Sequence, residues 1–569
     1  MTNNLVFADY LVFIIYFLIV ASYGYWIYNK KKKNISDTKD FFLAEGSLTW
    51  WAIGASLIAS NISAEQFIGM SGEGYFVGIA VAAYEWMAAL ALIIIAVWFI
   101  PVYLKNKIYT MPQFLTRRYN NTVALIMAIF WLFLYVFVNL TSILYLGSVA
   151  INGLLGGQHL HQIMLALAVF ALIITLGGMK VIGFTDVIQV GVLIIGGLAT
   201  TYLALTIVAE RFGVGTSALA GFKVLMQNAP EHFHMIIPTP TSTSPQIDVD
   251  KYLVLPGVAM YFAGQWIVNL NYWGCNQYIT QRALGANLKT ARTGLLFAGF
   301  LKLLMPVIVM LPGIAAYVLY KNGHLPQLQG GSKDGAYSAI LGFLPGGLKG
   351  LSIAALTAAI VASLAGKVNS ISTIYVLDIH KKYFNKDADE KKMVNLGRIT
   401  VVAAMIIAVI FTWKDALGIG GVGGFTFIQK YTGFISPGVF AMFILGMFWK
   451  RTTGAAAIAG VITGFVLSVI FNEYAPDWFG HSTWLYTSYQ TTEVTAGISK
   501  LVWRIPFLLC MGYAFFFTVA IMVAMSLAGP KINPKAFELD KEMFKVSPST
   551  LALIILVLIT LSLLYIRFW

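Results

Sequence analysis

Apolar segments recur along the whole chain, and each is about as long as the 20 residues that an α-helix needs to cross a bilayer. Each segment therefore predicts one transmembrane helix. Together they predict an all-α polytopic membrane protein in which residues 1–569 form a single transmembrane domain. The fourteen predicted spans are 8–28, 50–75, 79–103, 123–152, 161–177, 183–208, 252–275, 293–319, 350–377, 397–413, 419–447, 454–471, 501–527 and 549–567.

Two of these spans carry polar side chains near mid-membrane, and they stand five spans apart. The interrupting residues are Asn61, Ser63, Glu65 and Gln66 in the second span, and Gln265, Asn269, Asn271 and Asn276 in or beside the seventh. Interrupted helices at matching places in two halves are typical of inverted-repeat transporters, which hold substrate where the helices unwind. We therefore expect a five-plus-five core with repeats at about 50–208 and 252–447. The helices at 8–28, 454–471, 501–527 and 549–567 would be additions to it.

Composition agrees with a membrane protein. The chain is 59% hydrophobic and 11% charged, whereas a soluble domain carries roughly a quarter charged residues. The net charge of +14 does not indicate nucleic-acid binding, because Lys and Arg form short clusters between the spans, such as Lys30–Lys33 and Lys381–Lys382. The positive-inside rule places these clusters in the cytoplasm. It predicts a multi-pass protein of the plasma (inner) membrane with both termini extracytoplasmic.

Enzyme chemistry is not indicated. Cys275 and Cys510 lie in apolar segments and predict neither a disulfide framework nor a metal cluster. The sequence shows no paired aspartate motif and no nucleophile with a nearby base, so we predict a non-enzyme without an organic cofactor. The expected partners are the lipid bilayer and small solutes, with no obligatory protein partner evident.

Glu85 and Lys302 are charged residues within predicted spans, where each needs a pairing partner or a function. They can form a structural ion pair, or they can hydrogen-bond to sugar hydroxyls as acceptor and donor. Three amides and three flat side chains lie beside other polar breaks, and with the charged pair they favour a polyol-binding cavity. These residues are Gln66, Asn269, Gln429, Tyr272, Trp273 and Phe425.

The ninth span combines small residues with two polar ones. The stretch 358–366 allows close helix packing, and the Ser363 hydroxyl, together with carbonyls freed at a helix break, can supply oxygen ligands to sodium. Lys367 lies one turn beyond Ser363 on the same helix face. A lysine there can snorkel to the cytoplasmic surface, pair with an acid or act as a cation near the ion site.

A long motif points to a family. The run Ala55–Gly69 (ASLIASNISAEQFIG), with Tyr84-Glu85-Trp86, Asn276-Gln277-Tyr278, Gln281-Arg282 and Tyr431-Thr432-Gly433, resembles the solute:sodium symporter family, specifically its sodium/glucose cotransporter branch. The resemblance covers the chain from about residue 8 to the last span. It implies a leucine-transporter-like fold with fourteen helices and sodium-coupled symport of a glucose- or galactose-type monosaccharide, with Na⁺ as coupling ion.

The resemblance also implies roles for individual residues. The implied sugar site is Gln66, Glu85, Asn269, Lys302 and Gln429, with Tyr272 as inner gate. The implied outer gate is Met70, Tyr84 and Phe425. The implied sodium ligands are the carbonyls of Ala59, Ile62 and Ala359 and the hydroxyl of Ser363. Asp186 matches an acid that shapes the ion exit or a second ion site in relatives.

The chain departs from the family pattern near the ion site. Ala362 stands where relatives commonly have a first serine, so one expected sodium hydroxyl is missing. Ala365 and Gly366 stand where some relatives have further hydroxyls for a second ion, and Lys367 stands where relatives have an apolar residue. We therefore predict no second sodium site, and an Asp186–Lys367 ion pair in its place. Ala88 stands where some members have a sugar-contacting serine.

Other functions remain open at this point. They are a sodium-independent sugar transporter or a sugar sensor with Lys367 in place of an ion, and a symporter of another polyol such as inositol.

Overall fold

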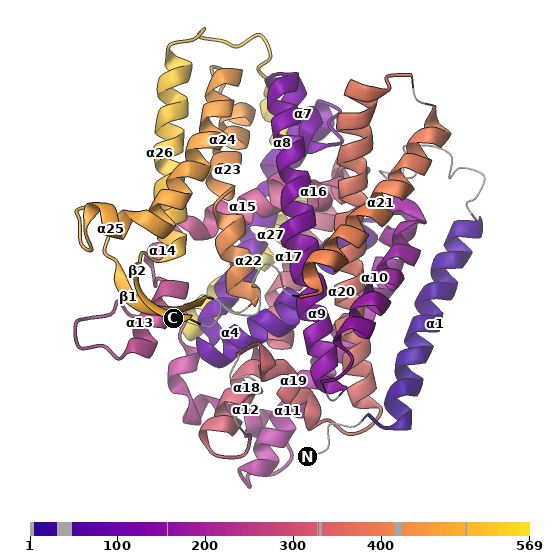
Figure 1. Cartoon of the computed structure of the whole chain (residues 1–569), viewed down its shortest axis with the longest axis vertical. Helices are drawn as coiled ribbons and strands as arrows, with labels where there is room; N and C mark the ends of the chain where they lie inside the picture. Colours follow the sequence, from indigo (N-terminus) through magenta and orange to yellow (C-terminus); the bar gives the residue numbers. More distant parts are fainter. Residues whose placement is uncertain are drawn as a thin grey trace.

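The computed structural model describes residues 5–30, 48–155, 157–326, 328, 333–387, 389–414, 424–495 and 498–569. Its helices form a bundle in which most long helices run close to the vertical direction of Figure 1. The elements of the first half are α1 (Phe7–Lys30), α3 (Trp50–Asn61), η3 (Glu65–Met70), α4 (Ser71–Phe76), η4 (Ile79–Ala82), α5 (Ala83–Ile94), η5 (Ile95–Phe99), α6 (Ile100–Lys105), α7 (Met111–Arg118), α8 (Asn121–Phe133), η6 (Leu134–Leu140), α9 (Thr141–Leu154), α10 (Leu160–Thr175), α11 (Gly178–Arg211), α12 (Ala218–Asn228) and η7 (Pro230–Phe233).

The second half continues with further helices and one hairpin. Its elements are α13 (Gln246–Val254), α14 (Ala259–Phe262), α15 (Gly264–Cys275), α16 (Gln277–Leu284), α17 (Leu288–Val309), α18 (Leu311–Lys321), η9 (Lys333–Gly335), α19 (Ala336–Gly342), α20 (Leu348–Thr373), η10 (Ile374–Phe384), α21 (Glu390–Thr412), α22 (Gly424–Gly433), α23 (Ser436–Phe448), α24 (Gly454–Val469), η12 (Ile470–Tyr474), α25 (Ala475–Phe479), β1 (Tyr489–Thr495), β2 (Ile498–Arg504), α26 (Phe507–Leu527), η13 (Lys541–Phe544) and α27 (Pro548–Phe568).

Within the described ranges, ten helices are long and apolar enough to cross a membrane, and twelve spans result if each of two bent helix pairs counts as one. Two of the predicted spans fall outside this count: 161–177 corresponds to the shorter α10, and 50–75 is divided among α3, η3 and α4. The structure thus confirms a helical membrane architecture, and the number fourteen stays a prediction.

Helix α20 lies at the centre of the bundle. Every residue from Ser352 to Thr373 is buried, and the helix packs against α1, α3, α10 and α11. A helix that is covered on all sides needs no polar face, which explains its run of small and apolar residues. Ser363 and Lys367 are therefore held inside protein rather than against lipid.

The seventh predicted span breaks at a different place from the one predicted. Its amides Gln265, Asn269 and Asn271 lie on the continuous helix α15, and the chain bends by 81° just before that helix, at Ala263. The helix tolerates the amide of Asn269 because its Nδ2 donates to the carbonyl of Gln265 at 2.9 Å, one turn earlier. A second bend, of 52°, separates α22 from α23 and was not predicted.

An antiparallel hairpin corrects the all-α expectation. Strands β1 and β2 pair Tyr489 with Arg504, so residues 501–504 belong to a strand and the thirteenth span starts at Phe507. Residues 489–495 include three threonines and one valine, and such β-branched residues favour strands. The hairpin contacts α13, because Thr491 Oγ1 donates to Asp250 Oδ1 at 2.8 Å.

Candidate substrate and ion site

The second predicted span breaks as the sequence predicts. Helix α3 ends at Asn61, the backbone is extended at Ile62 with φ −79° and ψ 114°, and helical structure resumes at Glu65. Gln66 stabilises the break, since its Oε1 accepts hydrogen bonds from Ser63 N at 2.9 Å and from Ser63 Oγ at 3.2 Å. Because the carbonyls in the last turn of a helix lack intrahelical donors, this break leaves backbone oxygens available.

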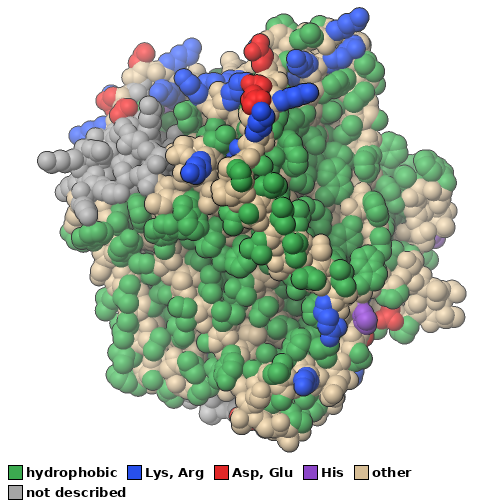
Figure 2. All heavy atoms as spheres, turned by 180° about the vertical axis from the view of Figure 1, so that it is seen from behind, with side chains coloured by type: hydrophobic (Ala, Val, Ile, Leu, Met, Phe, Trp, Pro, Cys, Tyr) green, Lys and Arg blue, Asp and Glu red, His purple; other side chains and the backbone are tan. Residues whose placement is uncertain are grey.

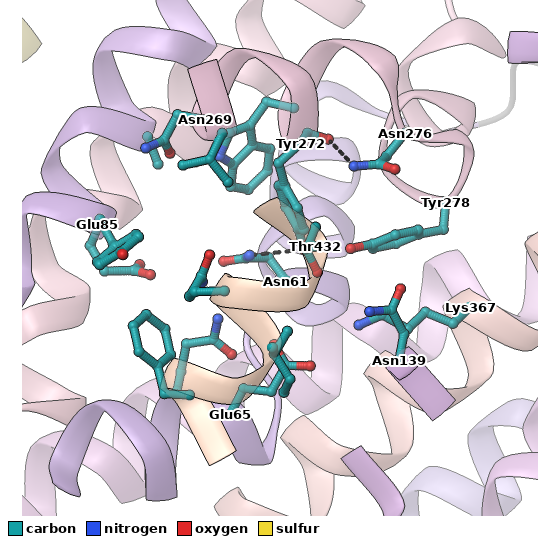
Figure 3. A pocket seen from close by; sticks show the side chains of 18 of the residues that line it. Asn61, Glu65, Glu85, Asn139, Asn269, Tyr272, Asn276, Tyr278, Lys367 and Thr432 are labelled. Atoms are coloured by element: carbon teal, nitrogen blue, oxygen red, sulfur yellow. Dashed lines mark hydrogen bonds between the residues drawn. The ribbon is translucent and has the colours of Figure 1, made fainter. Parts of the chain in front are cut away.

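A cavity lies beside this break, and Figure 3 shows it from close by. Glu85 and Asn269 lie on one side of the view, and Asn139, Tyr278 and Lys367 lie on the other. All six residues predicted to contact sugar line this cavity. Its lining is Asn61, Glu65, Gln66, Tyr84, Glu85, Ala88, Leu134, Asn139, Val268, Asn269, Tyr272, Trp273, Asn276, Tyr278, Lys302, Lys367, Phe425, Ile428, Gln429 and Thr432.

The charged residues Glu85 and Lys302 are in direct contact on the cavity wall. Lys302 Nζ donates to Glu85 Oε2 and to Asn61 Oδ1, and it lies 5.3 Å from the centroid of the Trp273 ring. Asn61 Nδ2 in turn donates to the hydroxyl of Tyr272 at 3.0 Å. The pair is therefore an ion pair, and it also lines the cavity, while its hydrogen bonding to sugar hydroxyls stays a prediction.

Aromatic rings close two sides of the cavity. The rings of Tyr84 and Phe425 meet edge to face with centroids 5.1 Å apart, and the Tyr272 ring lies 5.2 Å from Trp273 and 5.7 Å from Tyr278. Met70, the third predicted outer-gate residue, is buried at the end of η3 but does not line the cavity.

Gly69 lets η3 lie close to Phe425 of α22. A Cβ at this position would lie 2.5 Å from the Cβ of Phe425, so only glycine lets η3 approach α22 this closely.

The two helices that carry most of the predicted sodium ligands, α3 and α20, are in contact beside the break. Ser363 Oγ donates to the carbonyl of Ser60 at 3.2 Å, which joins α20 to the last turn of α3. Ala59 and Ile62 flank Ser60, and Ala359 lies one turn before Ser363. Hydroxyl and carbonyl oxygens are ligands that suit a hard monovalent cation, so this donor set fits sodium.

The predicted Asp186–Lys367 ion pair is not what the structure forms. Asp186 Oδ2 lies 3.6 Å from Arg282 Nη2 and accepts from Ser56 Oγ at 2.5 Å, while Arg282 Nε donates to the same Ser56 Oγ at 2.7 Å. Lys367 Nζ instead donates to Ser363 Oγ at 3.1 Å. The prediction was wrong because the sequence assigns Arg282 to a basic cytoplasmic loop. In the structure Arg282 lies on the buried helix α16, where its guanidinium is close to Asp186.

Sequence reasoning also missed cavity residues. Asn139, Tyr278 and Thr432 line the cavity, as does Asn61, which was treated only as a polar break. Asn139 had a usable signal, because it is a lone amide within an otherwise apolar stretch of span four. Tyr278 and Thr432 had a weaker one, since both fall inside the motifs that carry the family resemblance.

Comparison with known proteins decides the family. Residues 41–464 match the family model described as sodium:solute symporter family. The chain belongs to this family. It is similar to a sodium/glucose cotransporter of Vibrio parahaemolyticus, with 41% identity over 100% of this chain and 99% of the relative. It also resembles sodium/myo-inositol cotransporter 2 of Mus musculus, with 32% identity over 81% of this chain and 69% of the relative.

A solved structure shares the fold. A Na⁺-coupled sialic acid symporter in a substrate-bound, outward-open state superposes with a TM-score of 0.75 and 18% identity, covering 93% of this chain and 100% of that one. At this identity the likeness concerns the fold alone.

Proposed function

We propose that this member of the family is a sodium-coupled symporter of a glucose- or galactose-type monosaccharide. The observation that carries the proposal is the Glu85–Lys302–Asn61 network, which lies on the wall of a buried cavity beside the broken second span. The similarity over the full chain to the Vibrio sodium/glucose cotransporter supports the same substrate class.

The cavity wall offers sugar hydroxyls both donors and acceptors. Glu85 accepts and Lys302 donates, and the amides of Gln66, Asn269 and Gln429 do both. The carboxylate and ammonium neutralise each other, so a neutral solute does not have to compensate a buried charge. Tyr272 would form the inner gate, and Tyr84 and Phe425, with Met70 behind them, would form the outer gate.

Sodium would bind between α3 and α20. The carbonyls of Ala59, Ile62 and Ala359 and the hydroxyl of Ser363 would be its ligands. Sodium would favour the state that binds sugar from outside, and a rearrangement of one helix group against the other would then open both sites to the cytoplasm. Because linkage is reciprocal, sodium and sugar must each raise the affinity of the other by the same factor.

The membrane arrangement belongs to the same proposal. We place fourteen spans in the plasma (inner) membrane with both termini outside, and assign the core to a leucine-transporter-like inverted repeat at about 50–208 and 252–447. Breaks in the helices lie in both repeats, at Ile62 in the first, and before α15 and between α22 and α23 in the second, which supports such an architecture.

Another polyol is a second candidate substrate. The myo-inositol cotransporter of mouse matches this chain over 477 residues, and myo-inositol, like a pyranose, presents a ring of hydroxyls. Adding myo-inositol as a competitor in the uptake assay described next distinguishes a monosaccharide substrate from an inositol substrate.

Uptake by reconstituted protein tests the proposal. Proteoliposomes are given labelled galactose or glucose with an inward sodium gradient, or with potassium in its place, and excess myo-inositol serves as competitor. The proposal expects concentrative sugar uptake with sodium only. Equal uptake with both cations contradicts sodium coupling. If a low concentration of myo-inositol abolishes the uptake of labelled sugar, inositol is the preferred substrate.

A further inference from the structure

Lys367 lies where the coupling ion is expected. Its Nζ donates to Ser363 Oγ at 3.1 Å, and Ser363 is the single side-chain ligand among the proposed sodium ligands. The lysine is 2% exposed and lies on the buried helix α20, so it does not reach the cytoplasmic surface by snorkelling. Its nitrogen lies 4.8 Å from the centroid of the Tyr278 ring, which faces the cation with its π system.

The hydrogen bonds of Ser363 show why an ammonium and a sodium ion compete here. The hydroxyl has one proton, which it donates to the Ser60 carbonyl, and its oxygen accepts from Lys367. Sodium on this oxygen would stand within about 5 Å of the ammonium, where two unit charges repel strongly at an effective dielectric constant of about 20. The two cations therefore cannot share Ser363 as the structure shows it.

Glu65 provides a second position for the ammonium. It is buried at the start of η3 and lines the same cavity as Lys367, and the charges of Glu65 and Lys367 attract each other. The Oε1 atom of Glu65 has no hydrogen-bond partner among the described residues. Buried polar atoms without partners are rare and call for an explanation. The remaining charged neighbour, Arg282, repels Lys367 and is paired with Asp186.

We propose that Lys367 is a built-in competitor of the coupling sodium ion, whose ammonium holds Ser363 in the ion-free protein and is displaced to Glu65 when sodium binds. This inference rests on the proposed sodium site between α3 and α20. It gives a function to a buried lysine beside the proposed sodium site without making transport sodium-independent.

The displacement also reaches the sugar cavity. Lys367 contacts the Tyr278 ring, Tyr278 packs against the inner-gate residue Tyr272, and Tyr272 accepts the hydrogen bond of Asn61 that continues to Lys302. Moving the ammonium toward Glu65 therefore neutralises the carboxylate next to Gln66. It also removes the contact between Lys367 and the Tyr278 ring, which packs against Tyr272. Both changes occur on the wall that contacts the sugar.

Sodium binding to the purified protein without sugar tests the competition directly. We would measure binding of labelled sodium, with tryptophan fluorescence as a second readout, for the wild type and for Lys367→Met, which keeps the length of the side chain and removes its charge. Removing the competitor should raise sodium affinity at least about tenfold. The matched control is Lys349→Met, which removes a buried lysine of the same helix outside the cavity and should leave the affinity unchanged.

A double-mutant cycle with Glu65→Gln tests the second position. With Lys367 present, Glu65→Gln should weaken sodium binding, because the displaced ammonium loses its acceptor. In the Lys367→Met background the same change should have a clearly smaller effect, since coupled residues are non-additive. If Lys367→Met purifies as an unfolded or aggregated protein, Lys367→Gln replaces it in the cycle.

The outcomes separate this inference from the proposed function. Unchanged or weaker sodium binding by a folded Lys367→Met protein overturns the competition, as do additive effects in the cycle, and either result leaves sodium symport standing. A wild-type protein that binds no sodium and transports sugar equally well in potassium overturns the proposed function itself.

Discussion

Four charged side chains line the cavity, and they form two unlike pairs. Glu85 and Lys302 are in contact, whereas Glu65 and Lys367 attract each other without a direct hydrogen bond, and Lys367 contacts Ser363 instead. Two acids and two bases keep the lining neutral, which makes the burial of four ions tolerable. Glu85 and Lys302, which are in contact, are suited to bind substrate from fixed positions. Glu65 and Lys367, which are not in contact, leave room for the ammonium of Lys367 to move.

Replacing Glu85 tests the fixed pair. Glu85→Gln leaves the ammonium of Lys302 without its carboxylate and replaces a charged acceptor of sugar hydroxyls by a neutral one. Hydrogen bonds to charged groups contribute about 1.5–3 kcal/mol, so sugar affinity should fall by more than tenfold. Binding of labelled sugar in saturating sodium measures the change.

The control for this experiment is Glu210→Gln, an exposed acid at the end of α11. It should leave sugar affinity as it is in the wild type. A Glu85→Gln protein that is folded and binds sugar with wild-type affinity would show that the pair is structural only.

Helix α22 lines the cavity and is joined to its neighbours by a buried carboxylate. It carries Phe425 and Gln429, and Thr426 Oγ1 donates to the buried Glu73 Oε1 of α4 at 2.5 Å. Lys333 Nζ of η9 lies 2.6 Å from the same oxygen. One carboxylate thus joins α4, α22 and η9 beside the proposed outer gate, and it holds α22 against α4.

Glu73→Gln should loosen this outer closure. The neutral amide keeps the volume but loses the ion pair with Lys333, so the outward-open state should become more populated. A cysteine in place of Gln429 reports the opening, because an external thiol reagent should modify it several-fold faster in the Glu73→Gln background. Identical modification rates with and without Glu73→Gln, with Glu210→Gln as matched control, would contradict the role of Glu73 in closure.

The elements also show what the sequence can and cannot predict. Hydropathy located the helical segments, and the polar run at Asn61–Gln66 located the broken helix, because polar groups and lost backbone bonds are both costly in a bilayer. The bend at Ala263 lies just before the amides that indicate a break in the sequence, and those amides belong to the continuous helix α15. The predicted thirteenth span includes residues 501–504 of the hairpin, because the apolar residues of β2 lie close in sequence to those of α26.

The sequence predicts many of the residues that line the cavity but not all of the contacts between them. Residues that share the cavity were found from residue type and from the family resemblance, whereas partners depend on the packing of distant helices. Arg282 and Asp186 are 96 positions apart in sequence and meet only because α16 lies buried beneath α3. Nothing local in the sequence distinguishes Arg282 from Lys367 as the partner of this acid.

At the scale of the whole molecule, charge and hydrophobicity are separated. Figure 2 shows hydrophobic side chains over the middle of the molecule and most Lys and Arg side chains gathered toward its upper end. That distribution is typical of a membrane protein whose basic end faces the cytoplasm. The lower end of Figure 1, near the start of α1, would then face outward.

Protease accessibility of terminal tags tests this orientation. Tags at both ends of the chain should be digested by protease added to intact spheroplasts, because both termini are placed outside. A tag inserted after Lys386, in the basic region between η10 and α21, should be digested only after the membrane is opened. Protection of either terminal tag in intact cells would contradict an even number of spans with both ends outside.

The central claim is that sodium and sugar bind together at adjoining sites in one broken-helix core. Equilibrium binding to the purified protein tests it most directly, with sugar affinity measured in sodium and in choline, and sodium affinity measured with and without sugar. The account predicts that each ligand tightens the other by the same factor. Sugar affinity that is equal in sodium and in choline would contradict it.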